Sequence, residues 1–127
     1  MLLNLTDLSD EPLQGQISRQ IRARILAGGL PAGETLPSIR ALARAQQVSV
    51  ITVQRAYEAL EREGLIHSRR GKGFFISELR DQRRKDMAEQ RLIQKMAPLV
   101  ADARSEGLSK AEIKEVFETV MNVQIDK

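Results

Sequence analysis

The chain has 127 residues, 42% of them apolar, which is enough for one ordinary domain or for a small domain with an appendage. Its net charge is only +3, but Ser38–Gly73 contains seven Lys or Arg against three Glu, a balance of 7 − 3 = +4. It has no cysteine and a single histidine, His67, which excludes disulfides and thiolate metal sites and leaves a hydrolase dyad only one possible base.

No segment predicts export or membrane insertion. The amino terminus has no basic stretch followed by an apolar run, and no window approaches the roughly 18 continuous apolar residues of a membrane span. We therefore expect a soluble cytoplasmic protein with neither a metal nor another cofactor.

The first third of the chain predicts two helices separated by a loop. After Pro12, which suits a first helical turn, apolar residues recur at every fourth position: Leu13, Ile17, Ile21 and Ile25. Gly28–Thr35 is rich in Gly and Pro, so it ends this helix. Ser38 can cap a second short helix over Ile39–Ala45, and Gln46–Val48 form the turn after it.

A third helix follows this turn. Ser49 has the chemistry of a helix cap, and Gly64 predicts an end at about Glu63. One face should lie in the core because its residues are apolar and helically spaced: Val53, Ala56, Tyr57 and Leu60. The opposite face is free for a partner and carries Ile51, Arg55, Glu58 and Arg62, with Thr52 and Gln54 on its flanks.

A basic hairpin completes the first half. Two short β segments, 65–68 and 74–77, flank a glycine-bearing loop made of Arg69, Arg70, Gly71, Lys72 and Gly73. Three helices followed by a hairpin predict a winged helix-turn-helix, so the fold is mainly α with a small β-wing.

The second half predicts helices that pack against a partner. Glu78–Lys85 is polar and basic, which indicates a hinge, and we divide the chain into a winged helix-turn-helix domain over 1–78 and a helical region over 79–127. A seam of apolar residues follows at helical spacing: Leu92, Met96, Leu99 and Ala103. Pro98 interrupts this seam, so we expect a kink or a break near 96–98.

Gly107 ends that element, and Ser109 with Glu112 forms a capping box for the next one. The last helix has an apolar stripe of Ile113, Val116, Phe117, Val120 and Met121. Two short amphipathic helices cannot bury both apolar faces against each other, so we expect a dimerisation hairpin.

Three stretches together resemble the GntR family of bacterial transcription regulators: LPSIRALA from Leu36, VSVITVQRAYEALEREGLI from Val48 and SRRGKGFFI from Ser68. With the preceding helix and the GGLPAGETLPS loop, the resemblance covers roughly residues 10–77, and the short helical remainder is similar to the YtrA subfamily. It implies a homodimer with one recognition helix from each subunit in successive major grooves of a pseudo-palindromic operator. It places DNA contacts on Arg40, Ser49, Val50, Ile51, Thr52, Gln54, Arg70, Gly71 and Lys72.

The chain departs from the family at two of these positions. Other members often carry arginine where Val50 and Gln54 stand here. By its chemistry, Arg55 could bind guanine, Gln54 could pair with adenine, and Ile51 or Val50 could pack on a thymine methyl group. In the wing, Gly71 permits close approach to the minor groove, whose negative potential attracts Arg69, Arg70 and Lys72.

Several other interpretations stay open. Arg40 could be a solvated helix residue, Arg62 could pair with Glu58, and the basic wing could be a solubilising hairpin tip. A winged helix can also be a protein-interaction module without sequence-specific DNA binding. An enzyme lacks support, since no glycine loop of the nucleotide-binding kind opens a helix. A small-molecule effector is possible, but no polar cluster in the second half indicates its class.

Overall fold

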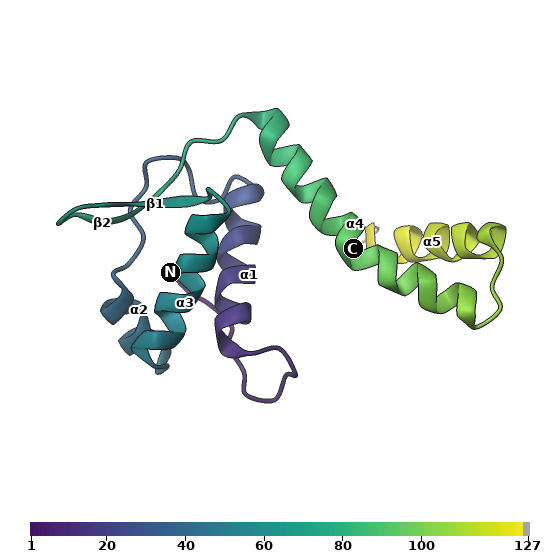
Figure 1. The fold of residues 1–127 in the computed structure, drawn as a ribbon, viewed down its shortest axis with the longest axis horizontal. Coiled ribbons are helices and arrows are strands. Elements are labelled where there is room, and N and C mark those ends of the chain that lie inside the picture. The colour runs from purple at the N-terminus through teal and green to yellow at the C-terminus, as the bar shows by residue number, and fades with distance from the viewer. Residues whose placement is uncertain (126–127) are drawn as a thin grey trace. The chain divides into compact units, whose positions relative to one another are not determined.

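The structure is a computed structural model that describes residues 1–125, and these residues form two compact units (Figure 1). One unit comprises Met1–Arg84 and the other begins at Lys85. The elements follow in the order α1 (Leu13–Leu26), α2 (Ile39–Gln46), α3 (Val50–Arg62), β1 (Ile66–Arg69), β2 (Gly73–Ile76), α4 (Asp81–Ser105) and α5 (Lys110–Ile125). No helix within 1–125 is long and apolar enough to cross a membrane.

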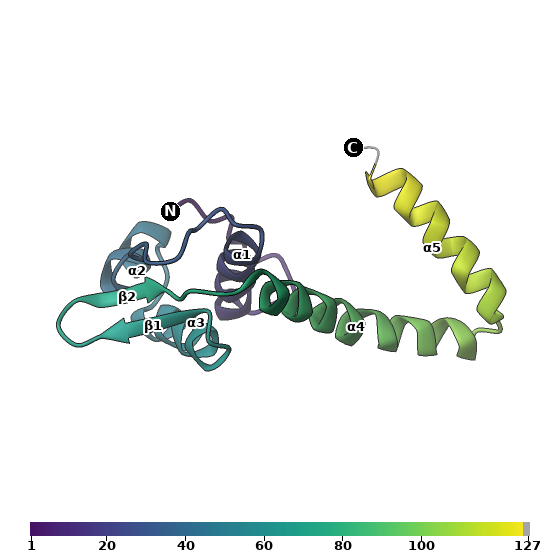
Figure 2. The ribbon, with the colours of Figure 1, turned by 90° about the horizontal axis from the view of Figure 1, so that it is seen from above.

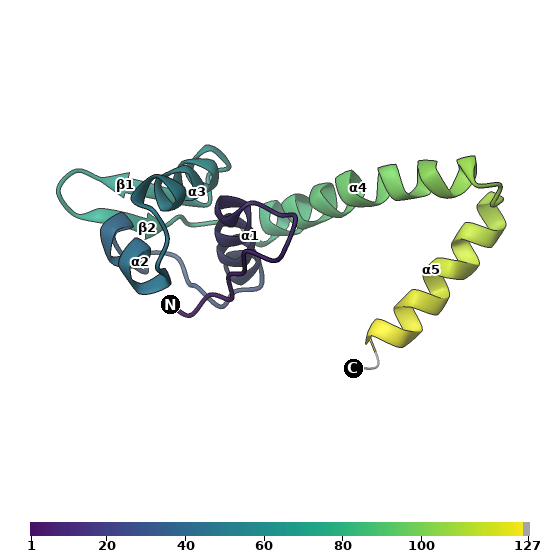
Figure 3. The ribbon, with the colours of Figure 1, turned by 90° about the horizontal axis from the view of Figure 1, so that it is seen from below.

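In the first unit, α1 and α2 pack on α3 (Figures 1 and 3). α1 and α2 both contact α3 and lie on different sides of it. Most of the predicted apolar residues form the core, although Leu13 is only half-buried; those that are fully buried include Ile17, Ile21, Ile25, Leu42, Val53, Tyr57 and Leu60. The predicted caps are also confirmed, because Ser38 Oγ accepts the Ala41 amide and Ser49 Oγ accepts the Thr52 amide, each at 3.1 Å. Gly64 follows α3 with a φ of 78°.

The hairpin has a shorter loop than predicted. The two strands pair antiparallel from Ile66 opposite Ile76 to Arg69 opposite Gly73, so Arg69 and Gly73 belong to the strands. The turn closes where the Lys72 amide donates to the Arg69 carbonyl at 2.9 Å. Positive φ angles at Gly71 and Gly73, 74° and 96°, allow this tight reversal without steric cost.

A third segment, Gly33–Leu36, joins the sheet beside β2. Thr35 forms a bridge with Phe75, the Gly33 amide donates to the Ile76 carbonyl at 2.8 Å, and the Leu36 amide donates to the Phe74 carbonyl at 2.9 Å. The sequence predicted this segment only as a loop. The pairing links the segment between α1 and α2 directly to the wing.

The amino-terminal arm also contributes to the core, which the sequence analysis did not predict. Leu3 is buried, and the buried Gln16 side chain holds the arm in place. Its carboxamide accepts the Thr6 amide and donates to the carbonyls of Thr6 and Glu11, at 2.8–2.9 Å. These bonds satisfy a polar group that would otherwise be costly to bury.

The second unit corrects two predictions. The hinge over Glu78–Lys85 is too long, because α4 already begins at Asp81, where an acidic residue suits the first turn of a helix. Of the predicted kink or break near 96–98, the break is wrong, since α4 is continuous through Pro98 (Figure 2). Proline removes one amide hydrogen bond, but the long part of α4 before it, 81–97, and the shorter part after it, 99–105, contain good helix formers such as Ala and Leu, which keep the helix intact.

The predicted capping box of α5 is present. The Ser109 amide donates to Glu112 Oε1 at 2.9 Å, and the Glu112 amide donates to Ser109 Oγ at 3.1 Å. Gly107, with a φ of 98°, lies in the turn before it. From this turn α4 and α5 diverge instead of packing along their lengths (Figures 2 and 3).

Candidate nucleic-acid interface

The amino end of α3 combines a well-formed cap with free amides. Ser49 Oγ and Thr52 Oγ1 lie 2.7 Å apart, and the Ser49 carbonyl accepts the Val53 amide at 3.3 Å. The amides of Val50 and Ile51, the first two of the helix, have no acceptor within it. This end therefore presents the positive pole of the helix and two hydrogen-bond donors to an anion.

The outward face of α3 is as the sequence predicted. Val50 and Ile51 are 47% and 48% exposed, and Gln54, Arg55 and Glu58 are exposed as well. The Gln54 carboxamide donates to Glu58 Oε1 at 3.1 Å, one helical turn along. Of the polar side chains on the first two turns, Arg55 is the longest donor with no internal hydrogen bond among the described residues.

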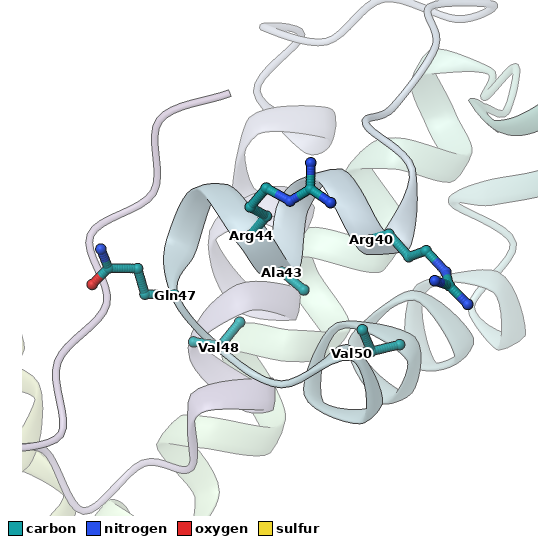
Figure 4. A pocket seen from close by; sticks show the side chains of 6 residues that line it. All are labelled: Arg40, Ala43, Arg44, Gln47, Val48 and Val50. Carbon is teal, nitrogen blue, oxygen red and sulfur yellow. The ribbon is translucent and has the colours of Figure 1, made fainter.

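A groove of about 390 Å³ separates α2 from the start of α3 (Figure 4). Its floor is apolar and its rim carries two guanidinium groups; the lining residues are Arg40, Ala43, Arg44, Gln47, Val48 and Val50. Gln47 makes the turn with a φ of 57°, the left-handed conformation that ends α2. Arg44 was not among the predicted contact residues. Its spacing of four from Arg40 on a helix was the signal that could have found it.

The wing presents its basic residues at the tip of the hairpin. Arg70, Gly71 and Lys72 form the turn and are exposed. Arg69 lies on β1, where its guanidinium sits 4.7 Å from the centre of the Phe75 ring. The Arg69 side chain therefore also has a structural contact, whereas within residues 1–125 the Arg70 and Lys72 side chains make no hydrogen bond, ion pair or ring contact.

Side-chain bonds fix α3 to its neighbours. The buried Tyr57 hydroxyl donates to the Pro37 carbonyl at 2.8 Å, and its ring meets Phe74 edge to face at 5.0 Å. Burial raises the pKa of the Tyr57 hydroxyl, so it stays protonated as a donor. Glu61 accepts bonds from the Ser68 amide and hydroxyl, at 3.3 and 3.1 Å, which ties the end of α3 to the wing.

At the other side of α3, a salt bridge holds it to α1. Arg22 Nε donates to Glu63 Oε1 at 2.8 Å, and its terminal nitrogen donates to Oε2 at 2.7 Å. The Arg22 side chain is only 10% exposed and that of Glu63 is 27% exposed. Both partners are thus largely removed from water and their fork geometry is specific.

Five exposed cations on α2, on α3 and at the hairpin turn have no ion-pair partner among the described residues. α2 and the hairpin turn lie on the opposite side of α3 from α1 (Figures 1 and 3). Among the residues that the structure describes, no carboxylate lies within 4.0 Å of the cationic groups of Arg40, Arg44, Arg55, Arg70 and Lys72. Positive charge without internal neutralisation, beside an exposed helix end, suits a polyanion such as DNA.

Residues 13–76 match the family model described as "Bacterial regulatory proteins, gntR family". The chain belongs to the GntR family. It is 30% identical over 125 residues to the transcriptional repressor YtrA of Bacillus subtilis, a match that covers 98% of this chain and 94% of that one. The predicted resemblance to the family and to its YtrA subfamily is therefore confirmed.

Solved structures agree with this assignment. A GntR family regulator from Listeria monocytogenes is 28% identical with a TM-score of 0.75, over 91% of this chain and 98% of that chain. YtrA from Sulfolobus acidocaldarius is 29% identical with a TM-score of 0.61, over 76% of this chain and 99% of that one. The predicted winged fold with a helical region after it is confirmed, and this GntR protein is a DNA-binding transcription regulator.

The second unit of this GntR protein carries a large uncovered apolar surface. Most of the residues predicted for dimerisation are exposed within one chain: Leu92, Leu99, Val116, Val120 and Met121. Met96 and Phe117 are half-buried, and Ile113 is buried. A pocket of about 310 Å³ lies between the diverging helices, lined by Leu99, Val100, Ala103, Leu108, Ile113, Val116, Phe117 and Val120.

Proposed function

We propose that this GntR regulator is a cytoplasmic repressor that binds a pseudo-palindromic operator as a homodimer, with α3 of each subunit in successive major grooves. The observation that carries the proposal is the exposed amino half of α3 beside unpaired cations on α2 and on the wing. Its relative in Bacillus subtilis is named a transcriptional repressor, which supports the same direction of control. The two half-sites would lie about 34 Å apart or a multiple of it.

The contact residues divide by the chemistry of their groups. Arg40 binds a phosphate beside the groove, with the cap residues Ser49 and Thr52 and the free amides of α3 facing the backbone. Val50, Ile51, Gln54 and Arg55 face the base edges in the major groove. Arg69, Arg70, Gly71 and Lys72 lie along the minor groove, where they add affinity more than sequence choice.

The helical region, 79–127, forms the dimer in this proposal, and 1–78 binds DNA. Support comes from Leu99 and Val116, which are 66% and 50% exposed although both are apolar. A single chain leaves these residues in water, and a second copy would bury them.

A small-molecule effector, if one acts, would release the operator by changing the spacing of the two wings. The relatives are transcription regulators, which supports a protein without enzymatic activity.

Salt dependence tests the DNA-binding interface. Affinity for a duplex operator is measured against salt concentration for the wild type, Arg40→Ala and Lys72→Ala. Log affinity falls as log salt rises, and each lost phosphate contact should make this slope less steep by about 0.9, hence by about 1.8 per dimer. Arg19→Ala is the matched control because Arg19 lies on α1 and pairs with Glu11, which precedes that helix, and the variant should leave the slope unchanged. Duplex binding without any salt slope would favour the protein-interaction module instead.

The oligomeric state tests the dimer. Val116→Glu should give a monomer with weak operator affinity, because it puts a charge on the apolar surface of α5. Asn122→Glu, at an exposed polar position of the same helix, should stay dimeric. Deletion of Arg104–Lys127 should also give a monomer. A truncated chain that stayed dimeric in sedimentation experiments would contradict the assignment of the helical region.

A further inference from the structure

The start of α3 presents an apolar surface where a DNA-reading helix usually presents polar groups. We propose that Val50 and Ile51 recognise the C5-methyl groups of thymines, so that each operator half-site is selected by thymine methyls at the base pairs facing this end of α3. The inference rests on the proposed operator binding and names the chemical group that gives it specificity.

The first observation is the exposure of these two side chains. Val50 and Ile51 occupy the first turn of α3 and leave about half of their surface in water, 47% and 48%, next to fully buried Val53. An isolated exposed apolar residue needs no explanation, but here two adjacent ones stand at the end of the helix that faces DNA. They lose no core packing if they contact a ligand.

The second observation is that the neighbouring polar side chains are already engaged. The hydroxyls of Ser49 and Thr52 bond to each other, and Ser49 Oγ also caps the helix. The Gln54 carboxamide is held by Glu58 and would have to leave that bond before it could pair with adenine. Arg55 remains as the polar side chain of α3 that can read a base. Val50 and Ile51 remain to contact the base edges that face the first turn of the helix.

The third observation is the place of Val50 in the groove beside α2. Val50 forms part of its floor together with Ala43 and Val48, and Arg40 and Arg44 stand on the rim (Figure 4). A DNA backbone drawn to these guanidinium groups would bring the adjoining base edges against Val50 and Ile51. The thymine methyl is the apolar group that the major-groove edge offers, so its burial there is favourable.

Deoxyuridine provides the direct test, since it differs from thymidine only by this methyl group. The best-bound duplex is first selected from a random pool with the full chain. Single thymines are then replaced by deoxyuridine and the dissociation constants compared. At thymines facing the start of α3, loss of one buried methyl should weaken binding about fourfold, and symmetric loss in both half-sites about fifteenfold. Thymines elsewhere in the duplex should show no change.

A pair of variants assigns the effect to its residues. In the Val50→Ala/Ile51→Ala variant, thymine and deoxyuridine duplexes should bind equally, within a factor of about two, while circular dichroism shows unchanged folding, since alanine favours helix. Arg19→Ala, a control on α1 outside the DNA-contacting residues, should keep the thymine preference. A general loss of structure would weaken both duplexes alike and leave their ratio unchanged.

The outcomes separate the two proposals. If the selected operator binds tightly and has no thymines in its half-sites, or if no deoxyuridine replacement weakens it, methyl recognition is refuted and operator binding stands. If the alanine variant keeps the full preference, Val50 and Ile51 are not its source. If the chain selects no duplex from the pool, operator binding itself fails, and the methyl proposal falls with it.

Discussion

Replacement of Arg22 by Met should destabilise the winged unit more than replacement of an exposed charged residue does. The Arg22 guanidinium makes two charge-assisted bonds to Glu63, at 2.8 and 2.7 Å, across the contact between α1 and α3. Removal of one partner from a fully buried pair costs about 3–5 kcal/mol. Because the Glu63 side chain is 27% exposed, water can partly replace the lost donor, and we expect a lower cost of about 2 kcal/mol.

Thermal unfolding followed by circular dichroism checks this value. A loss of about 2 kcal/mol should lower the midpoint by roughly 8–16 °C for a unit of this size. Arg19→Met is the matched control: Arg19 also lies on α1 and pairs with Glu11, but the pair is exposed, so its loss should cost about 0–1 kcal/mol. All samples are compared at equal concentration. Equal midpoints for the two variants would refute the argument that burial makes the Arg22 pair the stronger one.

Three further predictions concern stability. Gln47→Gly should raise the free energy of unfolding by about 1 kcal/mol, because Gln47 holds a left-handed φ of 57°; an unchanged or lower value in urea would contradict this. Tyr57→Phe should cost about 1–2 kcal/mol by leaving the Pro37 carbonyl without its donor, and urea unfolding of equal stability would argue against that bond. The Ser109 amide, and then its side chain, lower the pKa of Glu112. This stabilisation of α5 is therefore present above the unfolded-state pKa, about 4, and lost as pH falls through the lower folded-state value. The helicity of α5 in the wild type should fall in this pH range, and Glu112→Gln should remove this fall. An identical pH dependence of helicity in both proteins would contradict the prediction.

The first unit could be predicted from sequence because its signals are local. Ser38, Ser49 and Gly64 mark helix ends within a few residues, and the apolar spacing of α1 and α3 identifies the core directly. The pairing of Gly33–Leu36 with β2 could not be found this way, because its partners are about 40 residues apart and its composition is that of a loop. Leu3 was missed because it lies in an arm without helical or strand periodicity, so nothing in its sequence pattern marks it as buried.

The sequence could predict which residues of the candidate site are exposed, but not the hydrogen bonds among their side chains. Helical geometry correctly put Ile51, Arg55 and Glu58 outside. The bond from Gln54 to Glu58 has helical spacing and was within reach of the sequence, but whether such a pair forms is decided by competing solvent and rotamers. Continuity of α4 through Pro98 depends on the surrounding turns, which outweigh the local penalty of one proline.

The strand-like segment between α1 and α2 has a mechanical consequence. Gly33–Leu36, which precedes α2, is hydrogen-bonded to β2, and Glu61 of α3 is hydrogen-bonded to Ser68 of β1. A tilt of the wing would therefore have to move α2 and α3 with it or break these hydrogen bonds. The DNA-reading half should thus dock as a stiff body whose phosphate and base contacts keep a fixed registry. In the proposed dimer, a signal that releases DNA would therefore act on the distance between the two DNA-binding units, and not on the shape of either one.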